Sequence, residues 1–371
     1  MDKTNQYNGS EMKILFDNII FSLQKTGGIS VVWEEILKRV NNISGLETLF
    51  LEYNNDNLNR KSLVINSRNI LRTNSTLLKI KRYFNPTYKM NEKHIFHSSY
   101  YRTSKNKNAI NITTVHDFTY EYFNHGIRKF IHCWQKHRAI RKSDYIICVS
   151  SNTKSDLLKF IPDVDKKKIR VIYNGVSNDY YQLDNGKLLN NMPFEPYTYI
   201  LFVGERKGYK NFELSVNAIA KTNHKLIIVG KELLEKELDL LESTLGKERY
   251  NYVGRIPNNE LNILYNRAFC LLYPSSYEGF GIPVIEAQRA GCPVIAYNNS
   301  SIKEVIGNTP LLIDKLDIDS ILQKLTILNN EDIRSVIVKA GIENSKKYSW
   351  ENMFIDVLNL YNEAWNRNKE N

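Results

Sequence analysis

Short apolar runs alternate with helix-like segments along the whole chain, and this alternation constrains the fold more than any other feature. The runs are nearly continuous, which is typical of strands that helices cover on both faces. Strands that alternate with helices in this way predict a parallel α/β architecture. The predicted strands are Lys13–Asp17, Thr48–Glu52, His94–His97, Asn111–Val115, Tyr145–Val149, Arg170–Tyr173, Tyr199–Val203, Lys225–Val229, Tyr250–Val253, Phe269–Tyr273 and Pro293–Ala296.

The length of the chain and one polar stretch predict two domains. A chain of 371 residues suits two domains of ordinary size. The stretch 177–197 is rich in Asn, Asp, Gly and Pro, so we interpret it as a linker. We expect a Rossmann-like domain over residues 1–180 and a second one over 190–349, with a ligand site at the carboxyl ends of the strands. Apolar residues at helical spacing predict a final helix from Trp350 to Trp365.

The composition indicates in which cellular compartment the protein resides and which classes of partner it binds. The net charge of +11 favours polyanionic partners, namely nucleic acid, anionic lipid or phosphorylated substrates. The polar N-terminus lacks the apolar core of a signal peptide, and no apolar run approaches the length of a membrane span. Four scattered cysteines have no metal-ligand spacing, so we expect reduced thiols in a cytoplasmic protein; they are Cys133, Cys148, Cys270 and Cys292.

The segment Glu278–Ala287, EGFGIPVIEA, is the most informative part of the chain for function. The segment follows an apolar run that we interpret as a buried strand. Helix-like sequence comes after Pro283, and proline is favoured in the first turn of a helix. We therefore expect Glu278 on a loop and Glu286 in the first turn of the helix. The amides at such a helix start form a natural seat for a phosphate group.

This string, together with Gly291-Cys-Pro-Val-Ile-Ala296, resembles the E-x7-E motif of retaining, nucleotide-sugar-dependent glycosyltransferases of family 4. The resemblance implies the GT-B fold, in which two Rossmann-like domains face each other across a cleft and the final helix, here 350–371, crosses back to the first domain. It implies that Glu278 lies beside the donor sugar and that Glu286 holds the ribose hydroxyls. The donor would also border Gly279, Phe280, Gly281 and Ile282.

The segment from Tyr199 to Phe212 resembles the diphosphate-binding element of the same family. A strand ends at Gly204 and basic side chains follow, of which Arg206 and Lys210 are the predicted phosphate ligands; Lys207 is interpreted as part of a solvated loop. Fixed cations in a site that excludes water stabilise the negative charge that grows on a departing diphosphate, without a metal ion.

Three further segments resemble family motifs. His116 and Asp117 close the strand Asn111–Val115, and the resemblance places the histidine near the reacting centre; Asp117 either contacts a substrate or only caps and orients. Gly28 lies in a loop that resembles the family's first glycine-rich loop, where backbone approaches donor phosphate or acceptor. Gly254 and Arg255 lie where the nucleoside base packs in this family.

The string HSSYYR, which ends at Arg102, also follows a predicted strand and occurs in mannosyltransferase-like members of the family. Tyr100, Tyr101 and Arg102 are interpreted either as the acceptor side, where aromatic rings stack on sugars, or as residues packed under the sheet. The two readings are equally supported by the sequence.

We predict no metal ion and no cofactor. A metal-dependent glycosyltransferase of the other common fold needs an Asp-x-Asp pair directly after a buried strand. The two such pairs here, at 163–165 and 317–319, follow a proline and begin an apparent helix. Both are typical of solvated turns or caps. The chain also lacks G-x-G-x-x-G and the P-loop pattern, which argues against NAD enzymes and P-loop ATPases.

Two basic segments with interleaved apolar residues account for part of the positive charge. The segment Arg128–Lys142 carries Phe130, Ile131 and Trp134 among basic residues, and Leu77–Phe84 is similar. Such segments either lie on an anionic membrane surface or present an apolar stripe to the core and a basic face to solvent.

We therefore predict a retaining glycosyltransferase that moves a hexose from a nucleoside-diphosphate sugar to a hydroxyl of a growing, lipid-linked surface glycan. The HSSYYR and EGFGIP strings favour mannose from GDP-mannose, and UDP-sugar donors remain open. The protein would be cytoplasmic or peripheral at the inner face of the plasma membrane. The alternatives are a nucleotide-sugar epimerase or phosphorylase of the same fold, and a basic nucleic-acid-binding protein, which would expose base-stacking aromatics on a sheet. We predict no nucleic-acid partner.

Overall fold

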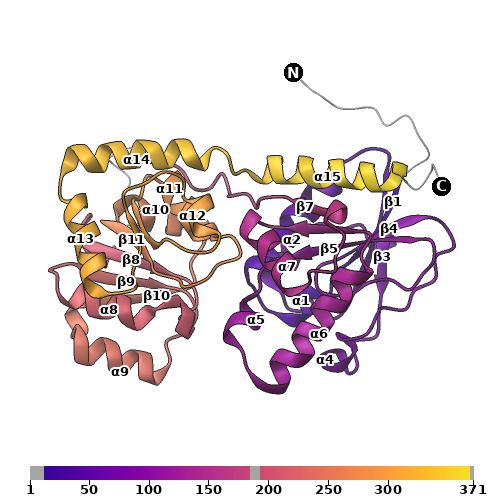
Figure 1. The fold of residues 1–371 in the computed structure, drawn as a ribbon, viewed down its shortest axis with the longest axis horizontal. Helices are drawn as coiled ribbons and strands as arrows, with labels where there is room; N and C mark the ends of the chain where they lie inside the picture. The colour runs from indigo at the N-terminus through magenta and orange to yellow at the C-terminus, as the bar shows by residue number, and fades with distance from the viewer. Residues whose placement is uncertain (1–11, 184–192, 368–371) are drawn as a thin grey trace. The chain divides into compact units, whose positions relative to one another are not determined.

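The computed structural model describes residues 12–183 and 193–367. The polar N-terminal segment, the middle of the predicted linker and the last four residues lie outside this part of the chain. The chain divides into two compact units, residues 1–174 with 350–371 and residues 175–349 (Figure 1).

The first unit contains a seven-stranded parallel sheet in the order β3-β2-β1-β4-β5-β6-β7, with helices on both faces (Figure 1). This arrangement agrees with the nearly continuous apolar strands. The strands are β1 (Met12–Asp17), β2 (Leu46–Glu52), β3 (Ile70–Arg72), β4 (His94–Ser98), β5 (Ala109–Val115), β6 (Tyr145–Cys148) and β7 (Ile169–Val171). The helices are α1 (Ile20–Leu23), α2 (Gly28–Val40), α3 (Leu58–Lys61), α4 (Leu78–Lys81), α5 (Thr119–Phe123), α6 (Gly126–Lys142), α7 (Ser151–Phe160) and α15 (Trp350–Arg367), with short 3-10 turns η1 (Ser67–Asn69) and η2 (Lys166–Lys168).

The second unit contains a six-stranded parallel sheet in the order β10-β9-β8-β11-β12-β13. The strands are β8 (Tyr199–Val203), β9 (Lys225–Val229), β10 (Tyr250–Gly254), β11 (Cys270–Tyr273), β12 (Val294–Tyr297) and β13 (Leu312–Ile313). The helices are α8 (Phe212–Ala220), α9 (Glu235–Thr244), α10 (Asn258–Arg267), α11 (Ile282–Arg289), α12 (Ile302–Val305), α13 (Ile318–Leu328) and α14 (Glu331–Ser345), with 3-10 turns η3 (Gly208–Lys210) and η4 (Lys247–Arg249).

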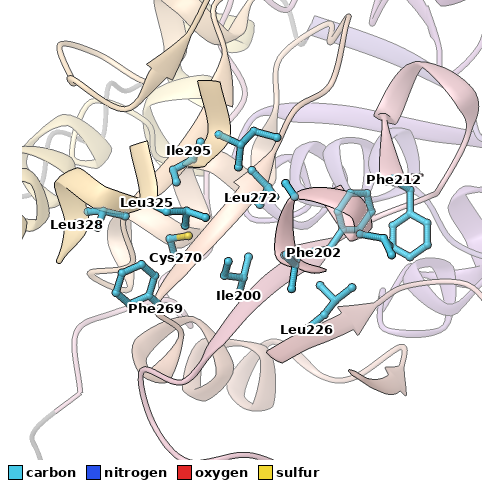
Figure 2. Close-up of a cluster of buried hydrophobic side chains, with 14 of the residues drawn as sticks. Ile200, Phe202, Phe212, Leu226, Phe269, Cys270, Leu272, Ile295, Leu325 and Leu328 are labelled. Carbon is cyan, nitrogen blue, oxygen red and sulfur yellow. The ribbon is translucent and has the colours of Figure 1, made fainter. Parts of the chain in front are cut away.

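A cluster of buried side chains between β-strands and helices stabilises the second unit (Figure 2). Ile200 and Leu226 from neighbouring strands are fully buried, and Leu325 and Leu328 of α13 belong to the same cluster. Cys270 lies in the same cluster and, like the other three cysteines, is free. Burial of each large aliphatic side chain contributes about 1.5–3 kcal/mol, so this cluster holds the strand ends of the unit in register.

The last helix, α15, packs on the first unit. Its Tyr361 is fully buried, and the hydroxyl lies 2.7 Å from Nδ1 of His97 on β4. Near the start of the helix, Glu351 forms an ion pair with Arg39 of α2 at 2.8 Å. The apolar stripe that the sequence shows at helical spacing therefore faces β4 and α2.

The segment just after residue 174 folds with the second unit rather than with the first. Val176 pairs with Ser349, and the backbone amides of Tyr181 and Leu183 donate to side chains of α10 at 3.1 and 2.8 Å. The border of the units thus lies a few residues before residue 180, where the sequence placed the end of the first domain.

No helix within 12–183 or 193–367 combines the length and the apolar character that a membrane crossing requires.

Candidate functional site

Three glycines end neighbouring strands at the carboxyl edge of the second sheet. Gly204, Gly230 and Gly254 follow or close β8, β9 and β10 and have φ angles of 125°, 152° and 73°. The amide of Gly230 donates to the carbonyl of Gly254 at 2.9 Å, and a Cβ on Gly230 would lie 2.4 Å from the carbonyl oxygen of Gly204. At Gly230 the backbone packs so closely that only glycine is accommodated, and the positive φ angles favour glycine at all three positions. Gly254 is a predicted site residue, whereas Gly230 was missed because the pattern Val-Gly is common.

Lys210 and Glu278 form an ion pair at this edge of the sheet. Nζ of Lys210 contacts Oε1 of Glu278, and the two side chains are only 14% and 13% exposed. The ring of Tyr273, at the end of β11, lies 5.3 Å from Nζ. An ion pair with so little water around it is stronger than a surface pair, which typically contributes 1 kcal/mol or less. The structure therefore brings together one predicted phosphate ligand and the predicted sugar-side carboxylate.

Two serines hold the loop that carries Glu278. The amide of Glu278 donates to Oγ of Ser300 at 2.9 Å, while Oγ of Ser301 donates to the carbonyls of Glu278 and Phe280 at 2.9 and 3.0 Å. Phe280 is buried and packs edge-on against Tyr348. The loop is thus bonded to the segment after β12. These serines were not predictable from the sequence because they lie more than twenty residues from the residues they contact.

Helix α11 begins directly after this loop, as the sequence predicted. Gly281 precedes the helix with φ of 96°, and a Cβ there would lie 2.6 Å from Cδ1 of Ile302. Ile282 is half-buried and Pro283 is the second helical residue. Among the described residues, no side chain caps the helix; Pro283 has no amide hydrogen, and the amide of Val284 donates to the carbonyl of Gly281 at 3.0 Å. Gly279 and Phe280 are buried, and their predicted place beside the donor stays a prediction.

Glu286 is the fifth residue of α11 and so lies in the second turn, one residue beyond the first turn that the sequence predicted. The hydroxyl of Tyr265 donates to its Oε2 at 3.1 Å, and Tyr180 lies beside it. Burial raises the pKa of Glu286 to about 7, against the opposing effect of the hydrogen bonds from the two tyrosines. This carboxyl therefore changes its charge near neutral pH.

Arg206 is held inside the second unit rather than presented openly. Its side chain is 3% exposed, and Nε lies 2.9 Å from Oε2 of Glu237. Nη2 donates to the carbonyls of Lys231 and Glu232, both at 2.7 Å. Nη1 is buried and has no hydrogen-bond partner among the described residues, so this nitrogen alone is free for a ligand. The role of Arg206 as a phosphate ligand stays a prediction.

Lys207 and Arg255 are exposed basic residues near the ends of β8 and β10. Lys207 pairs with Glu205 at 2.7 Å and is 61% exposed, which agrees with its interpretation as a loop residue. Arg255 follows β10 and is exposed. Its predicted place beside the nucleoside base stays a prediction.

His116 lies at the carboxyl end of β5 in the first unit, in the position that the sequence predicted. Burial lowers the pKa of His116 to about 4, although the neighbouring charge of Asp117 acts in the opposite direction. The imidazole is therefore neutral at pH 7. Oδ1 of Asp117 accepts from the amide of Thr119 at 3.1 Å, so Asp117 has the capping role that the sequence left open beside a substrate contact.

The glycine pair of the first unit opens α2. A Cβ on Gly27 would lie 2.7 Å from Oε1 of Gln24, whereas one on Gly28 would meet nothing within 4 Å. No side chain among the described residues caps this helix. Gly28 thus has open space beside the helix start, and its predicted contact with a donor stays a prediction.

Arg102 is buried in the first unit and ion-paired. Its guanidinium is 2% exposed and forms a two-pronged ion pair with Asp17 at the end of β1, with Nε 2.8 Å from Oδ2. Nη2 also donates to the hydroxyl of Tyr53 at 2.6 Å. These contacts use Nε and Nη2 and lie within the first unit, and the role of Arg102 in acceptor binding stays a prediction.

The two tyrosines before it differ in exposure. Tyr101 is 4% exposed, which fits the reading of a residue packed under the sheet. Tyr100 is half-buried, and its hydroxyl lies 3.0 Å from Nη2 of Arg82 and 3.1 Å from Nε2 of His132. Of the three residues, Tyr100 stays the best candidate for an acceptor contact.

The Asp-x-Asp pairs and the rest of the described chain offer no clustered metal ligands. Within residues 12–183 and 193–367, no group of three or more His, Cys, Asp or Glu side chains is arranged to hold a metal ion. Asp163 pairs with Arg141 at 2.7 Å, and Asp317 caps α13. Both pairs lie in turns or caps, and metal independence stays a prediction.

Two family models match most of the chain. The model for Glycosyl transferases group 1 matches residues 190–344, and the model for Glycosyltransferase Family 4 matches residues 46–180. The chain belongs to this family of glycosyltransferases. The resemblance that the sequence suggested is thereby confirmed, and the two matched regions fall on the two sheets of the structure.

Curated relatives of this glycosyltransferase include two O-antigen enzymes by name. O-antigen chain mannosyltransferase B of Escherichia coli is 27% identical over 237 residues, which cover 61% of this chain and 62% of that protein. O-antigen chain mannosyltransferase RfbU of Salmonella typhimurium is 30% identical over 246 residues, covering 65% of this chain and 66% of that protein. The chain thus matches a little under two thirds of the length of each relative.

Solved structures share the fold over nearly the whole glycosyltransferase chain. Sucrose-phosphate synthase from Thermosynechococcus elongatus has a TM-score of 0.76 at 18% identity and covers 96% of this chain and 100% of its own. WaaG, a glycosyltransferase involved in lipopolysaccharide biosynthesis, has a TM-score of 0.69 at 14% identity, covering 94% and 99%. These neighbours and the two parallel sheets confirm the predicted GT-B fold.

Proposed function

We propose that this glycosyltransferase moves a hexose from a nucleoside-diphosphate sugar to a hydroxyl of a growing surface glycan, with retention of the anomeric configuration and without a metal ion. The observation that carries the proposal is the Lys210–Glu278 ion pair, which lies beside the uncapped start of α11. A cation and a carboxylate at one sheet edge, beside the N-terminal end of a helix, are groups that suit a sugar diphosphate.

In the proposed reaction Lys210 has two partners in turn. Without a donor, its ammonium neutralises Glu278. When a donor binds, the diphosphate competes for the ammonium, and Glu278 is released toward the sugar. As the bond between sugar and phosphate breaks, negative charge grows on the diphosphate, and Lys210 stabilises it more strongly than in the ground state. The acceptor hydroxyl then attacks from the face that the diphosphate leaves, and its proton passes to the departing phosphate.

Glu286 and His116 have supporting roles in this proposal. An ionised Glu286 accepts hydrogen bonds from the ribose hydroxyls, and Tyr265 orients the carboxylate from the other side. His116 is neutral at pH 7, because burial lowers its pKa to about 4, so it donates or accepts a hydrogen bond at the sugar without adding a charge. Both roles follow from the family resemblance and from the positions of the residues, His116 at the end of β5 and Glu286 near the start of α11.

We propose mannose from GDP-mannose as the first donor to test, because two relatives are named O-antigen chain mannosyltransferases. The experiment is a panel of GDP-mannose, UDP-glucose, UDP-galactose and UDP-N-acetylhexosamines, scored for transfer to glycan acceptors and for slow hydrolysis. We expect turnover with GDP-mannose that disappears in Lys210→Met. Binding of a nucleotide sugar without any turnover in the panel would contradict the enzymatic role.

A UDP-sugar donor is the second candidate. A protein from Anabaena that shares the fold, with a TM-score of 0.70 at 14% identity, has been solved in complex with UDP-glucose. Turnover with a UDP-hexose and none with GDP-mannose in the same panel would favour this candidate.

We also propose that the first unit attaches to anionic membranes, where a lipid-linked acceptor would be presented. Helix α6 exposes Ile127, Phe130 and Trp134, whose side chains are 70%, 67% and 47% exposed. The segment around α4 exposes Leu77, Ile80 and Phe84 at 64%, 56% and 59%. We call these six residues the apolar patch. Exposed basic residues accompany the patch, namely Lys81, Arg128 and Lys142.

Hydrogen bonds join the two parts of the apolar patch. Arg138 of α6 donates to the side chain of Asn85 at 2.8 Å, and Gln135 donates to the carbonyl of Arg82 at 2.7 Å. The segment after α4 and helix α6 therefore form one surface. Apolar side chains among cations are typical of helices that lie in a membrane interface.

Co-sedimentation with liposomes tests the attachment. Reversing Arg128 and Lys142 to Glu should release the protein from anionic vesicles, because each basic residue near such a surface contributes about 1 kcal/mol. Reversing Lys166 and Lys167, which are exposed on η2, is the matched control and should change binding less. Equal loss in both variants would show that only net charge matters, and no binding at low salt would refute the attachment.

A further inference from the structure

Lys136 differs from every other basic residue of the segment Arg128–Lys142. The sequence grouped it with the cations of a solvated or membrane-facing surface. In the structure its side chain is fully buried, on the inner side of α6, and forms an ion pair with Glu121 at 2.7 Å. A buried ion pair rarely stabilises a fold more than well-packed apolar residues would, so its presence calls for another reason.

The buried ammonium reaches the turn that carries His116. Nζ of Lys136 donates to the carbonyl of Asp117 at 2.9 Å and lies 4.3 Å from the centre of the Phe118 ring. Glu121 holds the ammonium in place at 2.7 Å and also accepts from Nε2 of His137 at 3.1 Å. Helix α6 is thereby bonded to the backbone just after β5.

Glu121 is ionised under all ordinary conditions. Burial alone would raise the pKa of Glu121, but the hydrogen bonds from His137 and Lys136 and the charge of Lys136 lower it to about 2. The Glu121 carboxylate is therefore charged where it contacts Nζ of Lys136, beside the Asp117 carbonyl.

The turn is held from other sides as well. The hydroxyl of Tyr101 bonds to the backbone of His116. The side chain of Asp117 caps the start of α5, and Phe118 is fully buried against Phe160. Among these contacts, the Lys136–Glu121 pair is the one that links the turn to a long helix through a charged group.

We propose that Lys136 and Glu121 are positioning residues that hold the His116–Asp117 turn in the geometry that glycosyl transfer requires. The inference rests on the proposed function, since it acts through His116. A displacement of about 1 Å at a reacting group lowers turnover on the order of a hundredfold, so a clamp on this carbonyl has a measurable effect.

The double variant Lys136→Met with Glu121→Gln tests the clamp. It removes both charges together and so leaves no buried charge unpaired, which avoids the unfolding that a single substitution risks. We expect turnover to fall ten- to hundredfold, while the donor KM stays within about twofold because the predicted ligands of the diphosphate and the ribose, Lys210, Arg206 and Glu286, lie in the second unit. The conservative variant Lys136→Arg should retain more activity than Lys136→Met.

A surface pair on the same helix supplies the matched control. Arg141 and Asp163 form an ion pair at 2.7 Å, with 47% and 58% of the side chains exposed. Arg141→Met with Asp163→Asn should leave turnover unchanged. An equal loss in both double variants would show that any ion pair of α6 matters, and the clamp would be refuted.

Two readouts separate failure of the clamp from failure of the proposed function. In a His116→Ala background, removal of the buried pair should cost no further turnover, because the pair acts through His116. The ring resonances of His116, followed by NMR, should move in the buried double variant and stay in the control. If the His116 resonances do not move in the buried double variant, the positioning role of Lys136 and Glu121 is refuted, even when no donor is turned over. If the resonances move but turnover is unchanged, the role of His116 in the reaction is refuted.

Discussion

Glu286→Gln is predicted to make the second unit more stable at alkaline pH while it weakens donor binding. The amide has nearly the shape of the carboxyl and still accepts a hydrogen bond from Tyr265, which lies 3.1 Å away in the wild type. It cannot ionise, so it removes the free energy that an ionised carboxylate costs in this buried position. Stability and donor binding should therefore change in opposite directions.

The magnitude follows from the pKa of Glu286, which burial raises from 4.5 to about 7. Between these values the folded protein keeps a proton that the unfolded chain has lost, so the stability of the wild type falls as pH rises through this range. A tenfold change in proton affinity corresponds to about 1.4 kcal/mol, which gives a loss on the order of 3 kcal/mol above pH 7. Below pH 4.5 the carboxyl is neutral in both states and the loss vanishes.

The assay is urea unfolding of the wild type and Glu286→Gln at pH 5 and pH 8, with donor titration by calorimetry at pH 8. We expect the variant to gain about 2–3 kcal/mol relative to the wild type at pH 8 and much less at pH 5. Glu213→Gln, at an exposed glutamate of the same unit, is the matched control and should show no such dependence. A gain that is equal at both pH values, or no gain at pH 8, would refute the reasoning.

Three further predictions test other parts of the site. Glu278→Ala should lower turnover on the order of a hundredfold or more, while donor binding is kept or strengthened because Lys210 loses its competing partner. Steady-state kinetics measure the turnover and calorimetry measures the binding. Near-normal turnover in a folded variant would contradict the assignment. Gly281→Ala should lower the free energy of unfolding by about 1–3 kcal/mol, because the residue has a φ of 96° and a Cβ would clash with Ile302. Gly208→Ala, where a Cβ would meet nothing within 4 Å, is the control and should change the free energy of unfolding little. Urea unfolding compares the two variants, and equal effects would refute the predicted strain at Gly281. Activity should survive EDTA, and loss that magnesium or manganese restores would overturn metal independence.

The fold was predictable from the sequence because it depends on short-range patterns. Nearly continuous apolar runs marked eleven strands, and β-strands of the structure overlap each of them. β3 and β13 were missed since they are edge strands of three and two residues, too short to show a pattern. The start of α11 was predicted because glycine and proline have position-specific backbone preferences there.

The partners of charged residues were not predictable, because they are set by contacts between distant segments. Lys136 and Arg138 look alike in the sequence, yet only the first is buried, since Glu121 supplies a partner fifteen residues away on another helix. Arg102 finds Asp17 across 85 residues. The carboxyl ends of parallel strands meet at one edge, so the sequence predicts which loops converge but not which side chains pair.

The most direct test of the central claim is the anomeric configuration of the glycosidic bond that the enzyme makes, followed by NMR during turnover of the nucleotide sugar. The account predicts a product with the same configuration as the donor, formed by the wild type and nearly absent with Glu278→Gln in a folded protein. An inverted product, or a retained product formed equally well by Glu278→Gln, would contradict the claim that the Lys210–Glu278 edge of the second sheet carries retaining hexosyl transfer.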